Sequence, residues 1–243
     1  MRAARNLAAL AAILTLVVVA ASAVIRLGAS ELGDSMAIVR GVHRVAASIA
    51  AVLVLALFWR ARQFSELRRA ASIALVLMLA LSVVGWVTGT QPPPAAALFN
   101  QLGGVTLAGL LAWLAGHAAE SPSNAAPDPA LALAALLLAS LQVVFGAALV
   151  MLGAPVAPVL LVAHAVSGLV AAATGAALGV RLCGSSDARH GALLLLCAAF
   201  TPAAGSLAVL PAPAMVVQVG HAAAAALLVA AVALAHGRMT RSA

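Results

Sequence analysis

Eight long apolar runs, separated by short polar stretches, dominate the pattern of the chain. They cover residues 7–25, 41–59, 70–90, 95–116, 130–152, 157–180, 191–210 and 213–235. A helix needs about 20 apolar residues to cross a bilayer. The pattern therefore predicts an all-α integral membrane protein with eight transmembrane helices and almost no domain outside the membrane.

The composition supports this prediction and excludes a soluble domain. Apolar residues make up 65% of the 243 positions and charged residues only 8%, whereas soluble domains are closer to half apolar. The net charge of +7 does not indicate a nucleic-acid partner, because every basic residue is an arginine and most arginines flank the apolar runs. The partner that the composition indicates is the lipid bilayer.

The arginines also predict how the chain is oriented in the membrane. Of the thirteen, ten lie at the chain ends, between the second and third runs, or between the sixth and seventh: Arg2, Arg5, Arg60, Arg62, Arg68, Arg69, Arg181, Arg189, Arg238 and Arg241. The positive-inside rule then places both termini in the cytoplasm, as in a multi-pass protein of the cell membrane. The other three, Arg26, Arg40 and Arg44, fall on the outer side and need another explanation.

The first run has an alternative interpretation as a cleaved signal peptide. Arg2 and Arg5 precede it, and Ala21-Ser22-Ala23 resembles a cleavage site. The run is long for a signal peptide, however, so we expect it to remain as the first membrane helix. The later topology is the same in either case.

Four polar residues inside the apolar runs recur at fixed intervals. His43 and Asn100 are 57 residues apart, His164 and His221 are again 57 apart, and His43 precedes His164 by 121. These intervals predict two four-helix bundle repeats, residues 1–118 and 130–243, joined by a polar, proline-rich cytoplasmic linker at 119–129. Both repeats begin on the same side, so we expect a pseudo-twofold axis along the membrane normal.

The histidines of the second repeat favour a bound metal cofactor. Each lies a few residues into a helix that begins at the outer surface, so His164 and His221 reach nearly the same depth. Neutral imidazole is a strong ligand for haem iron, and helix bundles commonly hold cofactors between facing helices. The simpler alternatives are a hydrogen bond between helices for each histidine and ordinary helix packing for the small residues around them.

The first repeat offers a different pair, because Asn100 stands where a second histidine is expected. An amide is a poor iron ligand, so we expect His43 to hold a haem more weakly or only transiently. The nearby Arg26, Arg40 and Arg44 are suited to bind haem propionates, and lipid headgroups are the alternative partner. The remaining histidines lie at cytoplasmic helix ends, where a solvated side chain is the simpler interpretation: His117, His190 and His236.

Several stretches, in order along nearly the whole chain, resemble the haem A synthase family. They are RLGAS after the first run, GVHRVAAS in the second, LQVVFGAALVMLGAPVAPVLLVAHAVSG in the fifth and sixth, and VVQVGHAAAAALL in the eighth. The resemblance implies an eight-helix membrane protein with haem b held by His164 and His221. It also implies that the N-terminal half takes haem O and oxidises its C8 methyl to a formyl group, giving haem A for terminal oxidases.

Three departures from the family pattern affect the first half. Arg40 stands where members usually have a glutamate, Asn100 replaces the partner histidine, and the cysteine pair of many bacterial members is missing. Two hypotheses follow. One is a divergent haem A synthase with His43 as the catalytic histidine and with haem O synthase and oxidase subunits as partners. The other is a non-catalytic haem b protein in electron transfer or cytochrome oxidase assembly.

Overall fold

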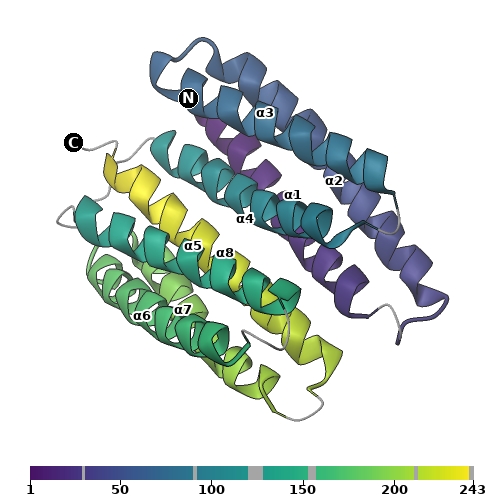
Figure 1. The fold of residues 1–243 in the computed structure, drawn as a ribbon. Helices are drawn as coiled ribbons and strands as arrows, with labels where there is room; N and C mark the ends of the chain where they lie inside the picture. The colour runs from purple at the N-terminus through teal and green to yellow at the C-terminus, as the bar shows by residue number, and fades with distance from the viewer. Residues whose placement is uncertain (29–30, 90–91, 120–127, 153–156, 211–212, 241–243) are drawn as a thin grey trace.

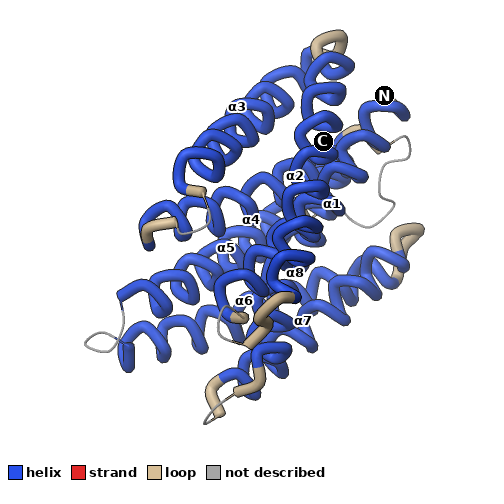
Figure 2. The backbone as a smooth tube through the Cα atoms, turned by 90° about the vertical axis from the view of Figure 1, so that its right-hand side faces the viewer, coloured by secondary structure: helices blue, strands red, loops and turns tan. Residues whose placement is uncertain are grey.

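A computed structural model describes the chain except for residues 29–30, 90–91, 120–127, 153–156, 211–212 and 241–243. In the described part the regular structure is helical (Figure 2). The helices are α1 (Arg2–Leu27), α2 (Ser35–Ala61), α3 (Ser65–Thr88), α4 (Pro94–His117), α5 (Pro129–Leu152), α6 (Ala157–Cys183), α7 (Ala188–Ala208) and α8 (Met215–Thr240). All eight are long and apolar enough to cross a membrane, which confirms the prediction of eight such segments.

The helix ends differ from the predicted spans in physically simple ways. α2 begins at Ser35 rather than at 41, because a helix continues past the apolar run where no proline or glycine stops it. His43 therefore lies eight residues inside the helix, more than two turns from its start. α3 ends at Thr88, just before Gly89, whose φ of 61° ends the helix. The predicted linker falls mostly outside the described residues.

The helix contacts link the chain into two closed cycles (Figure 1). α1 packs on α2, α2 on α3, α3 on α4, and α4 back on α1, while α5, α6, α7 and α8 contact one another in the same order. The cycles meet mainly where α4 packs on α8, with further contacts between α1 and α8 and between α4 and α5. The start of α1 and the end of α8 lie at the same end of the molecule (Figure 1).

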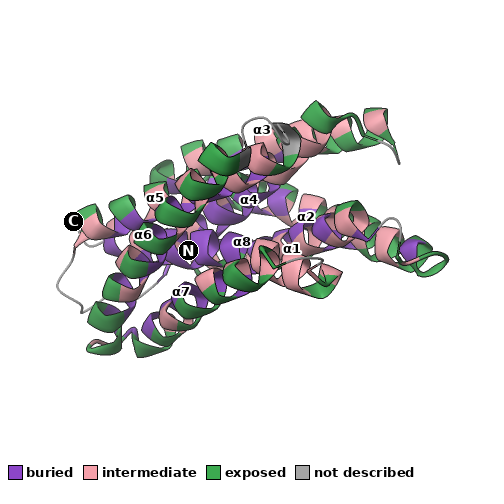
Figure 3. Ribbon diagram, turned by 60° about the horizontal axis from the view of Figure 1, so that its bottom comes forward, coloured by how far each residue is buried: buried purple, intermediate pink, exposed green. Residues whose placement is uncertain are grey.

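The buried residues concentrate on the helices where these cycles meet. α4 and α8 carry long runs of buried small and apolar side chains, and Figure 3 shows the outward faces of the surrounding helices as exposed. Many of those exposed residues are large and apolar, for example Val76, Trp86 and Val162. Such a surface is costly in water and suited to lipid.

Two glycines allow α4 and α8 to approach closely at the end where the termini lie. A Cβ added to Gly116 would collide with the Leu234 carbonyl, and one added to Gly237 would collide with the Trp113 carbonyl. Each of these pairs is related to the other by the same displacement of 121 residues. Close backbone approach at glycine is a common way to associate membrane helices in lipid, where burial of apolar surface gives no driving force.

Candidate metal centre

The structure brings the Nε2 edges of His164 on α6 and His221 on α8 together. Their Nε2 atoms are 3.5 Å apart, and the two rings are perpendicular with centroids separated by 5.7 Å. α6 and α8 each pack against both α5 and α7, so the two imidazoles meet across the middle of this cycle. Both side chains are half-buried.

Backbone carbonyls orient both rings. The Nδ1 of His164 lies 3.0 Å from the Gln142 carbonyl of α5, and the Nδ1 of His221 lies 3.0 Å from the Thr201 carbonyl of α7. A carbonyl can only accept a hydrogen bond, so each Nδ1 carries the proton and each Nε2 keeps its lone pair. The two lone pairs point at one another, with the Gln142 amide 3.5 Å from one of them.

This arrangement fits a metal that needs two axial ligands. Metal–imidazole bonds of about 2.0 Å on each side require the Nε2 atoms to be roughly 4.0 Å apart, so a small outward shift of the two rings suffices. Zinc sites use three or four protein ligands, and no group of three or more metal-ligating side chains occurs in the described residues. The pair therefore offers two nitrogen ligands, and a metal bound there would take its remaining ligands from another molecule.

Each imidazole also lies against a glycine one turn beyond the carbonyl that it contacts. A Cβ on Gly146 would lie 2.8 Å from the His164 Cε1, and a Cβ on Gly205 would lie 2.9 Å from the His221 Cε1. Both distances are shorter than a packed methyl group tolerates. The sequence analysis did not connect these glycines to the histidines. No signal in the sequence pairs these glycines with the histidines, because three-dimensional packing selects the carbonyls that the imidazoles contact.

In the first half, His43 of α2 contacts the neighbouring helix α1 through a side chain. Its Nδ1 lies 3.2 Å from the Ser22 hydroxyl. Asn100 of α4 has a buried side-chain oxygen that lacks a hydrogen-bond partner among the described residues, and no hydrogen bond joins it to His43 there.

The three outer arginines do not form one cluster with shared partners. Arg26, in the last turn of α1, donates to the Gln101 side chain of α4, next to Asn100. Arg40 is half-buried and Arg44 exposed, and both lie on α2 within three residues of His43. The three positive charges are therefore spread over the last turn of α1 and the first turns of α2.

The opposite end of the molecule holds an ion pair that the sequence analysis missed. Asp187, before α7, is only 3% exposed and binds Arg238 of α8, with Oδ1 2.6 Å from Nη2 and Oδ2 3.2 Å from Nε. Asp187 is the only acidic residue after Asp128, and that isolation was the available signal. Of the three histidines expected at this end, His117 stacks on Trp113 with ring centroids 4.7 Å apart.

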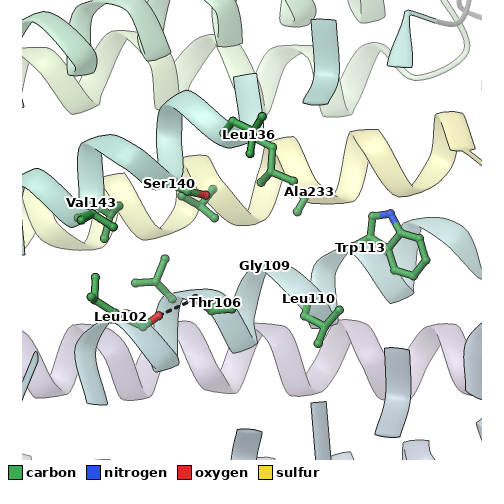
Figure 4. A pocket seen from close by; sticks show the side chains of 13 residues that line it. Leu102, Thr106, Gly109, Leu110, Trp113, Leu136, Ser140, Val143 and Ala233 are labelled. Atoms are coloured by element: carbon green, nitrogen blue, oxygen red, sulfur yellow. Dashed lines mark hydrogen bonds between the residues drawn. The ribbon is translucent and has the colours of Figure 1, made fainter. Parts of the chain in front are cut away.

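A cavity of about 500 Å³ lies apart from the histidines, between α4, α5 and α8 (Figure 4). Its lining is apolar apart from Ser140, Thr106 and the indole of Trp113. The Thr106 hydroxyl donates to the Leu102 carbonyl of its own helix at 2.8 Å. The lining contains no side chain that commonly binds a metal. This cavity is therefore suited to a hydrocarbon chain and not to a metal ion.

No protein-family model matches the chain, and no curated protein matches it at a significant level.

Proposed function

We propose that His164 and His221 bind haem b as the two axial ligands of its iron. The observation that carries the proposal is the pair of opposed Nε2 lone pairs, each fixed by a hydrogen bond from Nδ1 to a helix carbonyl. Such bonds on the outer nitrogen orient ligating imidazoles and raise their basicity. Bound there, haem supplies one-electron redox chemistry inside the membrane.

We further propose that the chain is a divergent haem A synthase, with haem O taken up in the N-terminal half. His43 is the iron ligand of that substrate, and the Ser22 hydroxyl orients its ring. Arg40 and Arg44 on the same helix are positioned to bind propionates. One imidazole without a second ligand suits a haem that must be released as product, since ligand loss then needs only one bond to break.

A second candidate function is a haem b protein without catalysis, for electron transfer or cytochrome oxidase assembly. The observation that favours it is Asn100, whose oxygen is buried and unpartnered among the described residues, 121 positions before His221. An unpaired polar group is costly in a membrane interior. A site that has lost its ligand leaves such a group.

Two structural features support an organisation in two four-helix repeats, residues 1–118 and 130–243. The helix contacts of α1 to α4 occur in the same cyclic order as those of α5 to α8, and the glycine contacts between α4 and α8 exchange under a displacement of 121 residues. The arginine distribution supports cytoplasmic termini in the cell membrane.

Pigment extraction tests the activity directly. The chain is co-expressed with a haem O synthase in a host that supports a known haem A synthase, and the extracted haems are separated by chromatography. Haem A or its hydroxylated intermediate is the expected product. Unchanged haem O beside a protein that carries haem b would instead establish the non-catalytic function.

A further inference from the structure

Gly146 lies beside His164 and Gly205 lies beside His221. These glycines offer a reason why the C-terminal half, and not the N-terminal half, has two imidazoles placed to bind one iron. We propose that Gly146 and Gly205 are positioning residues: each opens a notch in its helix that lets an imidazole reach a backbone carbonyl and turn its Nε2 toward the iron. This inference rests on the proposed haem b site and names residues of that site beyond the ligands.

The two notches have the same construction on different helices. On α5 the Gln142 carbonyl accepts from His164 and Gly146 follows four residues later. On α7 the Thr201 carbonyl accepts from His221, and Gly205 again follows four residues later. In a helix the residue four positions on covers the carbonyl, so a side chain there would block the ring.

An added methyl group therefore moves the imidazole instead of merely crowding it. With Cε1 only 2.8 and 2.9 Å from the added Cβ, and Nδ1 3.2 Å away in both cases, the whole edge of each ring must retreat. Retreat lengthens the hydrogen bond to the carbonyl and turns Nε2 away from its partner. Loss of such outer interactions typically lowers metal affinity by about 10- to 100-fold.

The first half lacks the corresponding notch opposite His43. The residue 121 positions before Gly205 is Val84, a half-buried β-branched residue on α3. A Cβ added to the neighbouring Gly85 would have no heavy atom within 4 Å. Asn100 thus stands in a site where a histidine would have no notch. The first half therefore lacks both the second histidine and the glycine that would make room for it.

The test compares Gly146→Ala and Gly205→Ala with Gly85→Ala, which removes a helical glycine where there is room for a methyl group. Purified proteins are compared by haem content, by the low-spin or high-spin character of the absorption and electron paramagnetic resonance spectra, and by elution volume. We expect each notch variant to lose the low-spin signal and to retain at least tenfold less haem, and Gly85→Ala to match the wild type.

A second pair of variants leaves the C-terminal half untouched, in case a notch variant fails to fold. Asn100→His alone is expected to add no low-spin haem, whereas Asn100→His combined with Val84→Gly is expected to add a second one. A wild-type spectrum in both notch variants, or a second low-spin haem from Asn100→His alone, would overturn the proposal. A wild-type protein with no low-spin haem would instead refute the haem b site itself.

Discussion

Between α6 and α8 two imidazoles meet with their Nε2 atoms 3.5 Å apart, whereas the first half has a single imidazole on α2 and an amide, Asn100, on α4. Both histidine-bearing helices of the second pair rest on a neighbour that offers a carbonyl and a glycine. His43 has the Ser22 hydroxyl as its partner, and the Asn100 oxygen has no hydrogen-bond partner among the described residues. The comparison teaches that a ligand in a helix bundle depends on the helix beside it as much as on its own.

The charges differ between the halves in a complementary way. Arg26, Arg40 and Arg44 lie near the end of the first half that is farther from the start of α1, while the corresponding described ends of α5 to α8 carry no arginine. The buried ion pair of Asp187 with Arg238 is found instead at the opposite end of the second half. A permanently held cofactor needs a rigid site, and an exchanging substrate needs an accessible charged entrance, so this division agrees with the two proposed roles.

The largest effect is expected from removing either ligand of the facing pair. His164→Ala or His221→Ala leaves the iron without one axial ligand in an apolar interior, so the purified protein should lose essentially all low-spin haem b. Optical spectra of reduced and oxidised protein check this. His117→Ala, His190→Ala and His236→Ala are the matched controls and should keep the full spectrum. A complete haem complement in the His164 or His221 variant would show that the ligands lie elsewhere.

The next effect concerns the single imidazole of the first half. His43→Ala removes the proposed ligand of haem O, so the yield of haem A or its hydroxylated intermediate should fall to background in cells that also express a haem O synthase. The low-spin haem b spectrum should be unchanged, because His43 is not part of the facing pair. If the variant makes as much product as the wild type, His43 is not the substrate ligand.

How far the sequence predicts this comparison depends on which forces set each feature. The spans were predictable because a bilayer requires long apolar runs, but their ends were not, since α2 continues six residues beyond its apolar run to Ser35. The repeated interval predicted that His164 and His221 meet. The carbonyls of Gln142 and Thr201 were not predictable, because every residue has a carbonyl and only three-dimensional packing selects two of them.

The buried ion pair should show the next largest difference between the halves. Asp187→Asn removes the carboxylate charge that Arg238 binds, and breaking a buried ion pair in this way typically costs about 3 kcal/mol. The residue 121 positions before Asp187 is Glu66, which is exposed. Glu66→Gln should therefore change stability little. Thermal unfolding in detergent, followed by the haem signal and by circular dichroism, compares the two variants. Equal losses of stability would mean that burial does not distinguish these acids.

The smallest expected effect tests whether the two halves share their interface equally. A methyl group on Gly116 meets the Leu234 carbonyl and one on Gly237 meets the Trp113 carbonyl. Since these contacts exchange under the 121-residue displacement, Gly116→Ala and Gly237→Ala should force α4 and α8 apart to the same extent. Each should destabilise the protein by about 2 kcal/mol, as expected for overpacking, whereas Gly85→Ala should be neutral or slightly stabilising because alanine favours a helix.

The two interface variants are compared in the same thermal unfolding assay, alone and combined. Because the glycines lie on the same crossing, the combined variant should lose less stability than the sum of the single losses, since one separation of the helices relieves both collisions. A large loss for one glycine and none for the other would contradict the pseudo-twofold relation between α4 and α8. It would do so without affecting the ligand assignment, because neither glycine contacts a histidine of the facing pair.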